Sequence, residues 1–134
     1  MGEIEYRILK KAGFVHFIGT GDISFDYLIK RIKDLHEDPD FDFSLNSFVD
    51  FGNATVSISD SSLEKYQSFF EDLQAANTQR RWGIYSKNKI TLISANVSHL
   101  LLSDVIKVDV FEIRKQALEY LGITDADLEN DAVI

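Results

Sequence analysis

The sequence predicts an α/β fold: a mixed, mostly parallel five-stranded sheet with four helices, in the order β-β-α-β-α-β-α-β-α. The first reason is the order of patterns, because one hairpin is followed by strand-then-helix units, and parallel neighbours need such crossovers. The second is composition, since 45% hydrophobic and 27% charged residues with one Pro are typical of a packed globular protein. The third is length: 134 residues suit one core, so we expect residues 1–134 to form one domain.

Two apolar runs at the start of the chain predict a hairpin. Ile4, Tyr6 and Ile8 alternate with charged residues, which is the period of a half-buried strand. A turn over residues 10–13 then leads into a second apolar run over residues 14–18. Two paired strands therefore open the fold.

A helix is predicted over residues 25–36. The glycines of Gly19-Thr-Gly21 are expected to break the second strand, and Ser24 is a residue type that caps helix N-termini. The helix must end before Pro39, because proline clashes with the preceding helical turn.

The middle of the chain predicts a buried strand over residues 46–51, with Asp50 near its C-terminal end, followed by a helix. Ser61 and Glu64 have the spacing of a capping box, and apolar residues recur at helical spacing from there to residue 76.

The second half predicts strands over residues 81–86 and 105–111 and a helix over residues 112–121, ended by Gly122. Residues 89–102 fit a helix, although their β-branched residues also fit a hairpin with the preceding strand. Both interpretations stay open.

The end of the chain, residues 123–134, is an acidic tail without a base. It is expected to form either one short helical turn capped by Thr124 or a frayed end.

The first, fourth and fifth predicted strands alternate polar with apolar residues. Strands covered by helices on both faces are apolar throughout, so these three are expected at sheet edges or on a partly uncovered face. Arg81 and Tyr85 are expected to point outward from such a face. A partner protein would dock there, and a homodimer through the sheet's face or edge is predicted.

The element order resembles that of bacterial STAS domains, specifically the SpoIIAA-like group. The resemblance covers nearly the whole chain and is carried by Phe48-Val-Asp50, Arg81-Trp-Gly-Ile84, Val108-Asp-Val-Phe111 and Ala117-Leu-Glu-Tyr-Leu-Gly122. It implies a short superhelix of β-α units with about four turns. It also implies a regulatory role through protein-protein contact, because the better-known relatives are anti-sigma-factor antagonists that bind partner proteins.

Those antagonists carry a phosphorylatable serine in a turn at the start of the second helix. Asp60-Ser61-Ser62-Leu63 is similar to that turn but lacks its glycine. The resemblance implies that Asp60, Ser61 and Ser62 form a regulatory turn with Ser61 as phospho-acceptor, whereas the pattern alone predicts a helix cap.

The charge and composition of the chain disfavour several classes of function. Fourteen Lys and Arg against 22 Asp and Glu give a net charge of −8, which disfavours binding to nucleic acid or an anionic membrane. The chain has no Cys, and His16, His36 and His99 lack metal-ligand spacing, so no metal and no cofactor is predicted. His16 is expected to be a hydrogen-bonded sheet residue. Without a recognisable catalytic set or a signal peptide, we expect a non-enzymatic cytoplasmic protein.

A basic segment stands out in this acidic chain, because residues 73–103 contain no acid. Its four Lys and Arg residues are Arg80, Arg81, Lys87 and Lys89. They favour an acidic partner or ligand. The alternative to a protein partner is therefore a small amphipathic or anionic ligand at the C-terminal strand ends, near Asp50 and Ser86, where open α/β sheets bind ligands.

Overall fold

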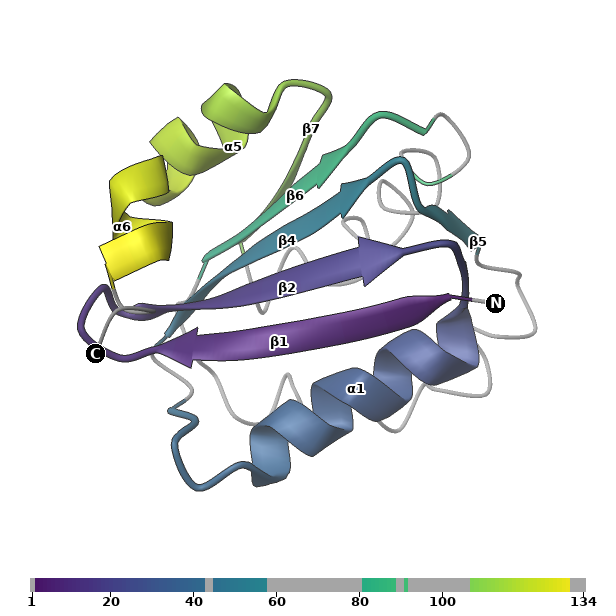
Figure 1. Cartoon of the computed structure of the whole chain (residues 1–134), viewed down its shortest axis with the longest axis horizontal. Coiled ribbons are helices and arrows are strands. Elements are labelled where there is room, and N and C mark those ends of the chain that lie inside the picture. Colours follow the sequence, from purple (N-terminus) through teal and green to yellow (C-terminus); the bar gives the residue numbers. More distant parts are fainter. Residues whose placement is uncertain (1, 43–44, 58–80, 89–90, 92–106, 131–134) are drawn as a thin grey trace.

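The computed structural model describes residues 2–42, 45–57, 81–88, 91 and 107–130, and its main sheet follows the order β1-β2-β4-β6-β7 (Figure 1). The strands are β1 (Glu3–Leu9), β2 (Phe14–Thr20), β4 (Asn46–Gly52), β6 (Arg81–Ser86) and β7 (Lys107–Phe111). Strand β1 is antiparallel to β2, and the other neighbours are parallel. The predicted mixed, mostly parallel five-stranded sheet is therefore confirmed.

Helices lie on both faces of this sheet. Successive strand residues point to opposite faces, so neighbouring positions such as Phe14 and Val15 join different apolar clusters. One cluster packs against α1 (Phe25–Glu37) and the other against α5 (Arg114–Leu121) and α6 (Asp125–Asn130). Helix α1 and the pair α5–α6 therefore cover opposite faces.

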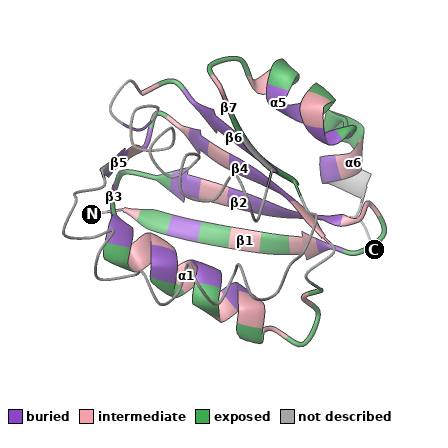
Figure 2. Cartoon of the chain, turned by 180° about the vertical axis from the view of Figure 1, so that it is seen from behind, coloured by how far each residue is buried: buried purple, intermediate pink, exposed green. Residues whose placement is uncertain are grey.

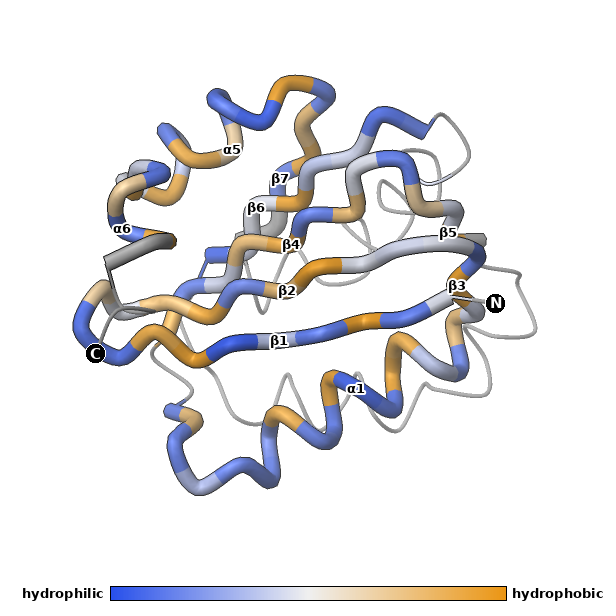
Figure 3. The backbone as a smooth tube through the Cα atoms, in the orientation of Figure 1, coloured by the Kyte–Doolittle hydropathy of each residue, from blue (hydrophilic) through white to orange (hydrophobic). Residues whose placement is uncertain are grey.

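Helix α1 begins and ends as predicted from the sequence. The Ser24 hydroxyl accepts a hydrogen bond from the Tyr27 N–H (3.2 Å), and the Asp38 N–H donates to the Leu35 carbonyl (3.0 Å). Figure 3 shows apolar positions recurring along the side of α1 next to the sheet. The buried residues on that side include Ile32 and Leu35, so helical periodicity positions α1.

The segment after β2 differs from the expectation. Gly19 does not break the strand, because β2 continues to Thr20. A Cβ at Gly19 would lie 2.7 Å from the Phe51 ring, so this glycine permits close packing. The next residues form β3 (Asp22–Ser24), which pairs in parallel with β5 (Thr55–Ser57) in a second, two-stranded sheet that the sequence did not predict.

Thr91 links the second sheet to a residue far along the chain. Its buried hydroxyl donates to the Ala54 carbonyl (2.9 Å) and accepts from the Val56 N–H (2.8 Å). Its own N–H donates to the Asn88 side-chain oxygen (3.1 Å). One hydroxyl thus satisfies two buried backbone groups beside β5.

The C-terminal helices follow their local signals. Gly122 has a φ of +71°, and its N–H donates to carbonyls of the last turn of α5. The Asp127 N–H donates to the Thr124 hydroxyl (3.3 Å), while the Thr124 N–H donates to the Asp127 carboxylate (2.8 Å). The short capped helix predicted as one alternative for the tail is therefore confirmed over 125–130.

Several predicted elements lie outside the described residues. They are the helix from Ser61 to residue 76, the helix or hairpin over residues 89–102, and the start of the strand predicted from residue 105. Helix α5 begins at Arg114 rather than at residue 112, because Ile113 has an extended backbone (φ −116°, ψ 119°).

Candidate functional site

Helices α5 and α6 leave part of their face of the sheet uncovered. Helix α5 contacts β4, β6 and β7, whereas Glu3, Glu5 and Arg7 of β1 point to this face and are exposed. Thr20, opposite Glu3 at the end of β2, is exposed too. Exposed residues alternate along β1 in Figure 2. We call the surface of Glu3, Glu5, Arg7 and Thr20 the open face. It confirms the partly uncovered face predicted at the first strand, β1, and extends to Thr20 of β2, which was not predicted.

The same expectation is wrong at β6. This strand lies between β4 and β7, and Tyr85 is only 6% exposed. The Tyr85 ring packs in the cluster with Ala117, Leu118 and Leu121 of α5. A tyrosine can bury its ring on a covered face, so alternation of residue types was misleading here.

The outer edge of β1 is covered by side chains of α1. The Ile4 N–H donates to the Tyr27 hydroxyl (3.3 Å), and Arg31 Nε donates to the Ile4 carbonyl (3.1 Å). The Arg31 guanidinium also lies over the Tyr6 ring at 4.9 Å, and the Tyr6 hydroxyl donates to Asp38 (3.1 Å). Burial and the bond to Asp38 both raise the pKa of Tyr6. These contacts block the addition of another strand beside Ile4.

Asp50, a predicted site residue, is held by a residue that the sequence did not single out. Arg114 Nε lies 3.6 Å from Asp50 Oδ2, and Arg114 Nη1 bonds Asp125 at the start of α6. The guanidinium lies 5.6 Å from the centre of the Phe48 ring. Burial raises the pKa of Asp50, although the charge of Arg114 acts in the opposite direction. Asp50 is thus part of a cluster that ties α5 and α6 to the sheet.

The sequence contains one clue to this role of Arg114. A base in the first helical turn is disfavoured by the helix dipole, so Arg114 at the start of α5 indicates a nearby acid. Which acid it meets depends on long-range packing, because Asp50 belongs to a distant strand.

His16 lies on the side of the sheet that carries the open face. Its side chain is buried, with 7% exposure. Its ring stacks on Phe48, with centroids 5.3 Å apart and planes inclined by 16°. Neither ring nitrogen has a hydrogen-bond partner within the described part of the chain, so the expected hydrogen bond is wrong. Burial lowers the pKa of His16 to about 4, and the charges of Arg114 and Arg7 act in the same direction. His16 is therefore neutral at pH 7.

Ser86 and Lys87 have different environments. Ser86 is fully buried, and its hydroxyl accepts from the Asn88 N–H (3.1 Å), which is a structural role. Lys87 is exposed beside it, and its N–H donates to the Gly52 carbonyl (2.8 Å). The charge of Lys87 slightly opposes the raised pKa of Asp50, so the structure places Lys87 and Asp50 near each other.

Arg81 lies at the opposite end of β6 from these residues. Its guanidinium lies 5.6 Å from the centre of the Tyr120 ring, and its Nη1 donates to the Tyr120 carbonyl (3.4 Å). Arg81 therefore contacts the end of α5 and is not brought together with Asp50. The other predicted site residues lie outside the described residues: Asp60, Ser61, Ser62, Arg80 and Lys89.

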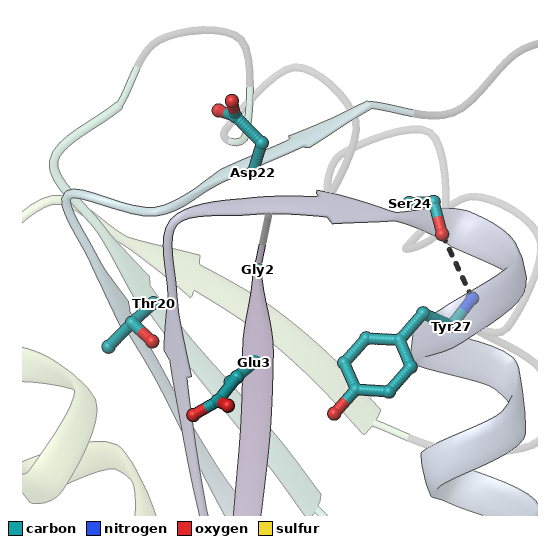
Figure 4. A pocket seen from close by; sticks show the side chains of 6 residues that line it. All are labelled: Gly2, Glu3, Thr20, Asp22, Ser24 and Tyr27. Atoms are coloured by element: carbon teal, nitrogen blue, oxygen red, sulfur yellow. Dashed lines mark hydrogen bonds between the residues drawn. The ribbon is translucent and has the colours of Figure 1, made fainter.

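A hollow of about 670 Å³ borders one end of the open face (Figure 4). It is lined by Gly2, Glu3, Thr20, Asp22, Ser24 and Tyr27. Among the described residues, this lining contains two carboxylates and no base. An anionic ligand would therefore be repelled from this hollow.

Within the described ranges, no group of three or more His, Asp or Glu side chains is arranged to hold a metal ion. Among the helices described, none combines the length and apolar character needed to cross a membrane.

Comparison with known proteins identifies the fold. No family model matches the sequence, and no curated protein matches it. A solved structure that matches is that of an uncharacterised protein from the DUF3478 family, with a SpoIIAA-like fold, from Shewanella loihica PV-4. The match has a TM-score of 0.55 and 11% identity, and it covers 90% of this chain and 93% of that chain. At this identity the likeness shows the fold alone.

Proposed function

We propose that this chain, which has a SpoIIAA-like fold, is a non-enzymatic regulatory module that binds another protein through its open face. The observation that carries the proposal is a charged sheet surface left uncovered beside α5 and α6. Its exposed side chains, Glu3, Glu5, Arg7 and Thr20, come from two paired strands.

The strands beneath this surface are held by the core on one side and by hydrogen bonds at the edge. On the opposite side of β1 and β2, Ile4, Val15 and Phe17 are buried in the core. Tyr27 and Arg31 fix the outer edge of β1 through Ile4. A surface held in one shape loses little conformational entropy on binding, which favours protein-protein association.

The burial and the lowered pKa of His16 support a non-enzymatic role. Its ring is stacked on Phe48 and buried, and its lowered pKa leaves it a weak base. A general base works best with a pKa near the working pH and within reach of its substrate. The low pKa and the burial of His16 both disfavour such a role.

The alternative function is binding of a small amphipathic or anionic ligand near Asp50 and Ser86. It has weaker support. Ser86 is buried and bonded to Asn88, and Asp50 is engaged by Arg114. The acidic hollow beside Glu3 and Asp22 disfavours an anion as well.

The experiment is site-specific photo-crosslinking in the native cells. A photoreactive amino acid replaces Glu5 on the open face, and a matched control replaces Lys30, which is exposed on α1. We expect a discrete protein adduct from position 5 and not from position 30, weakened when Arg7→Glu is added. Equal adducts from both positions, or no protein adduct together with a co-purifying small molecule in native mass spectrometry, would contradict the proposal.

A further inference from the structure

The charges on β1 change sign along the strand. On the open face the strand begins with Glu3 and Glu5 and continues with Arg7. Lys11, in the turn that follows, is exposed as well. These strand positions are about 6.7 Å apart, because alternate residues of a strand share a face. One half of the strand is therefore acidic and the other half basic.

We propose that the partner bound by the open face is a second copy of this chain, placed so that the two β1 strands cross antiparallel, face to face. This inference rests on the proposed function. With the twofold axis near Tyr6, Glu5 of each copy faces Arg7 of the other. Glu3 then lies toward the end of the partner strand that carries Lys11.

Twofold symmetry favours the antiparallel crossing of the two β1 strands over a parallel crossing. A twofold interface uses the same patch on both copies, so the patch must complement itself. The antiparallel crossing pairs Glu5 with Arg7 twice, whereas a parallel crossing would place Glu5 against Glu5. Like charges in contact are unfavourable.

The structure also favours a dimer through the open face over a dimer through the outer edge of β1. Pairing of two β1 edges would need the outer backbone groups of Ile4, which are bonded to Tyr27 and Arg31. Face-to-face contact leaves these hydrogen bonds intact. The net charge of −8 repels two copies at long range, so association depends on the local pairs.

The test is a charge swap at Glu5 and Arg7. Both side chains are exposed, and within the described residues neither forms an ion pair or a side-chain hydrogen bond, so the variants should fold. We expect Glu5→Arg and Arg7→Glu each to weaken self-association at least about tenfold. The double swap should restore it, and the two single variants, when mixed, should form a heterodimer. Lys30→Glu on α1 is the control and should change nothing.

Analytical ultracentrifugation measures the dissociation constants, and native mass spectrometry of a mass-tagged chain detects the heterodimer. A wild-type protein that stays monomeric up to about 1 mM overturns the inference. So does a dimer that both single swaps leave unchanged. If the chain is monomeric while position 5 crosslinks to a different protein, the proposed function stands and this inference alone fails.

Discussion

Arg114, the first residue of α5, reaches Asp50 on β4 with its Nε 3.6 Å from Oδ2, and the same guanidinium bonds Asp125 on α6. One side chain therefore joins two helices to the sheet. Arg114 is also the main counter-charge of the half-buried Asp50 carboxylate, with a smaller contribution from Lys87.

Loss of this counter-charge should destabilise the fold. Arg114→Gln is expected to lower the free energy of unfolding by about 1 kcal/mol, a value reduced for the partial exposure of both partners. The control is Lys115→Gln, because Lys115 is 84% exposed and its ion pair with Glu119 is long at 3.9 Å. Urea unfolding of both variants measures the difference, and equal midpoints would show that the Arg114 contacts add no stability.

His16 should make stability depend on pH. The unfolded histidine binds a proton near pH 6.5, while the folded one does so only near pH 4. Between these values the unfolded state carries more protons, so stability falls as pH falls from about 6.5 to 4. The loss amounts to at most about 3 kcal/mol.

The replacement His16→Phe removes the titrating group and keeps a ring against Phe48. Urea unfolding from pH 7 to 4 should therefore show a flatter profile for this variant than for wild type. Asp50 titrates in both proteins, so its contribution cancels in the comparison. A wild-type slope in His16→Phe would contradict the low pKa.

The outer edge of β1 gives a third prediction. Tyr27→Phe removes the hydroxyl that accepts the Ile4 N–H. We expect a loss of about 1 kcal/mol in stability and faster hydrogen exchange of the Ile4 amide. Hydrogen exchange followed by NMR measures both the local and the global effect, with Lys30→Gln as the control on the same helix. An unchanged exchange rate at Ile4 would mean that Tyr27 does not protect this edge.

Thr91 gives the fourth prediction. Thr91→Val keeps the shape but leaves the Val56 N–H and the Ala54 carbonyl without their partner. The cost should be about 2 kcal/mol, because buried polar groups without partners are penalised. Thr91→Ser keeps the hydroxyl and should recover most of the stability, which thermal or urea unfolding can measure. If the valine and serine variants are equally stable, the hydroxyl contacts do not matter.

The sequence predicted what depends on local chemistry. Ser24 and Thr124 cap their helices and Gly122 ends α5, because each signal acts within a few residues of its own helix. The strand periods placed β1, β2, β4 and β6 for the same reason.

Features that depend on contacts between residues far apart in the sequence were not predicted. Gly19 has the sequence pattern of a strand breaker but lies within the strand, where Phe51 packs against it. The ion pair of Arg114 likewise joins residues far apart in the chain. The candidate site was predicted in part: uncovered sheet surface was expected at the first strand, where the open face lies, but also at Tyr85, which is buried. The sequence also could not show that Ser86 is buried.

The order of the main sheet, β1-β2-β4-β6-β7, follows the order of the chain. Each parallel strand is added beside the one before it, and none has to insert between two strands already in place. The sheet can thus grow outward from the β1–β2 hairpin as the ribosome releases the chain, since domains begin to fold from the N-terminus during synthesis. Strand β7 and helix α5 come last in this order, and the Arg114 contact with Asp50 forms only after α5 has been synthesised.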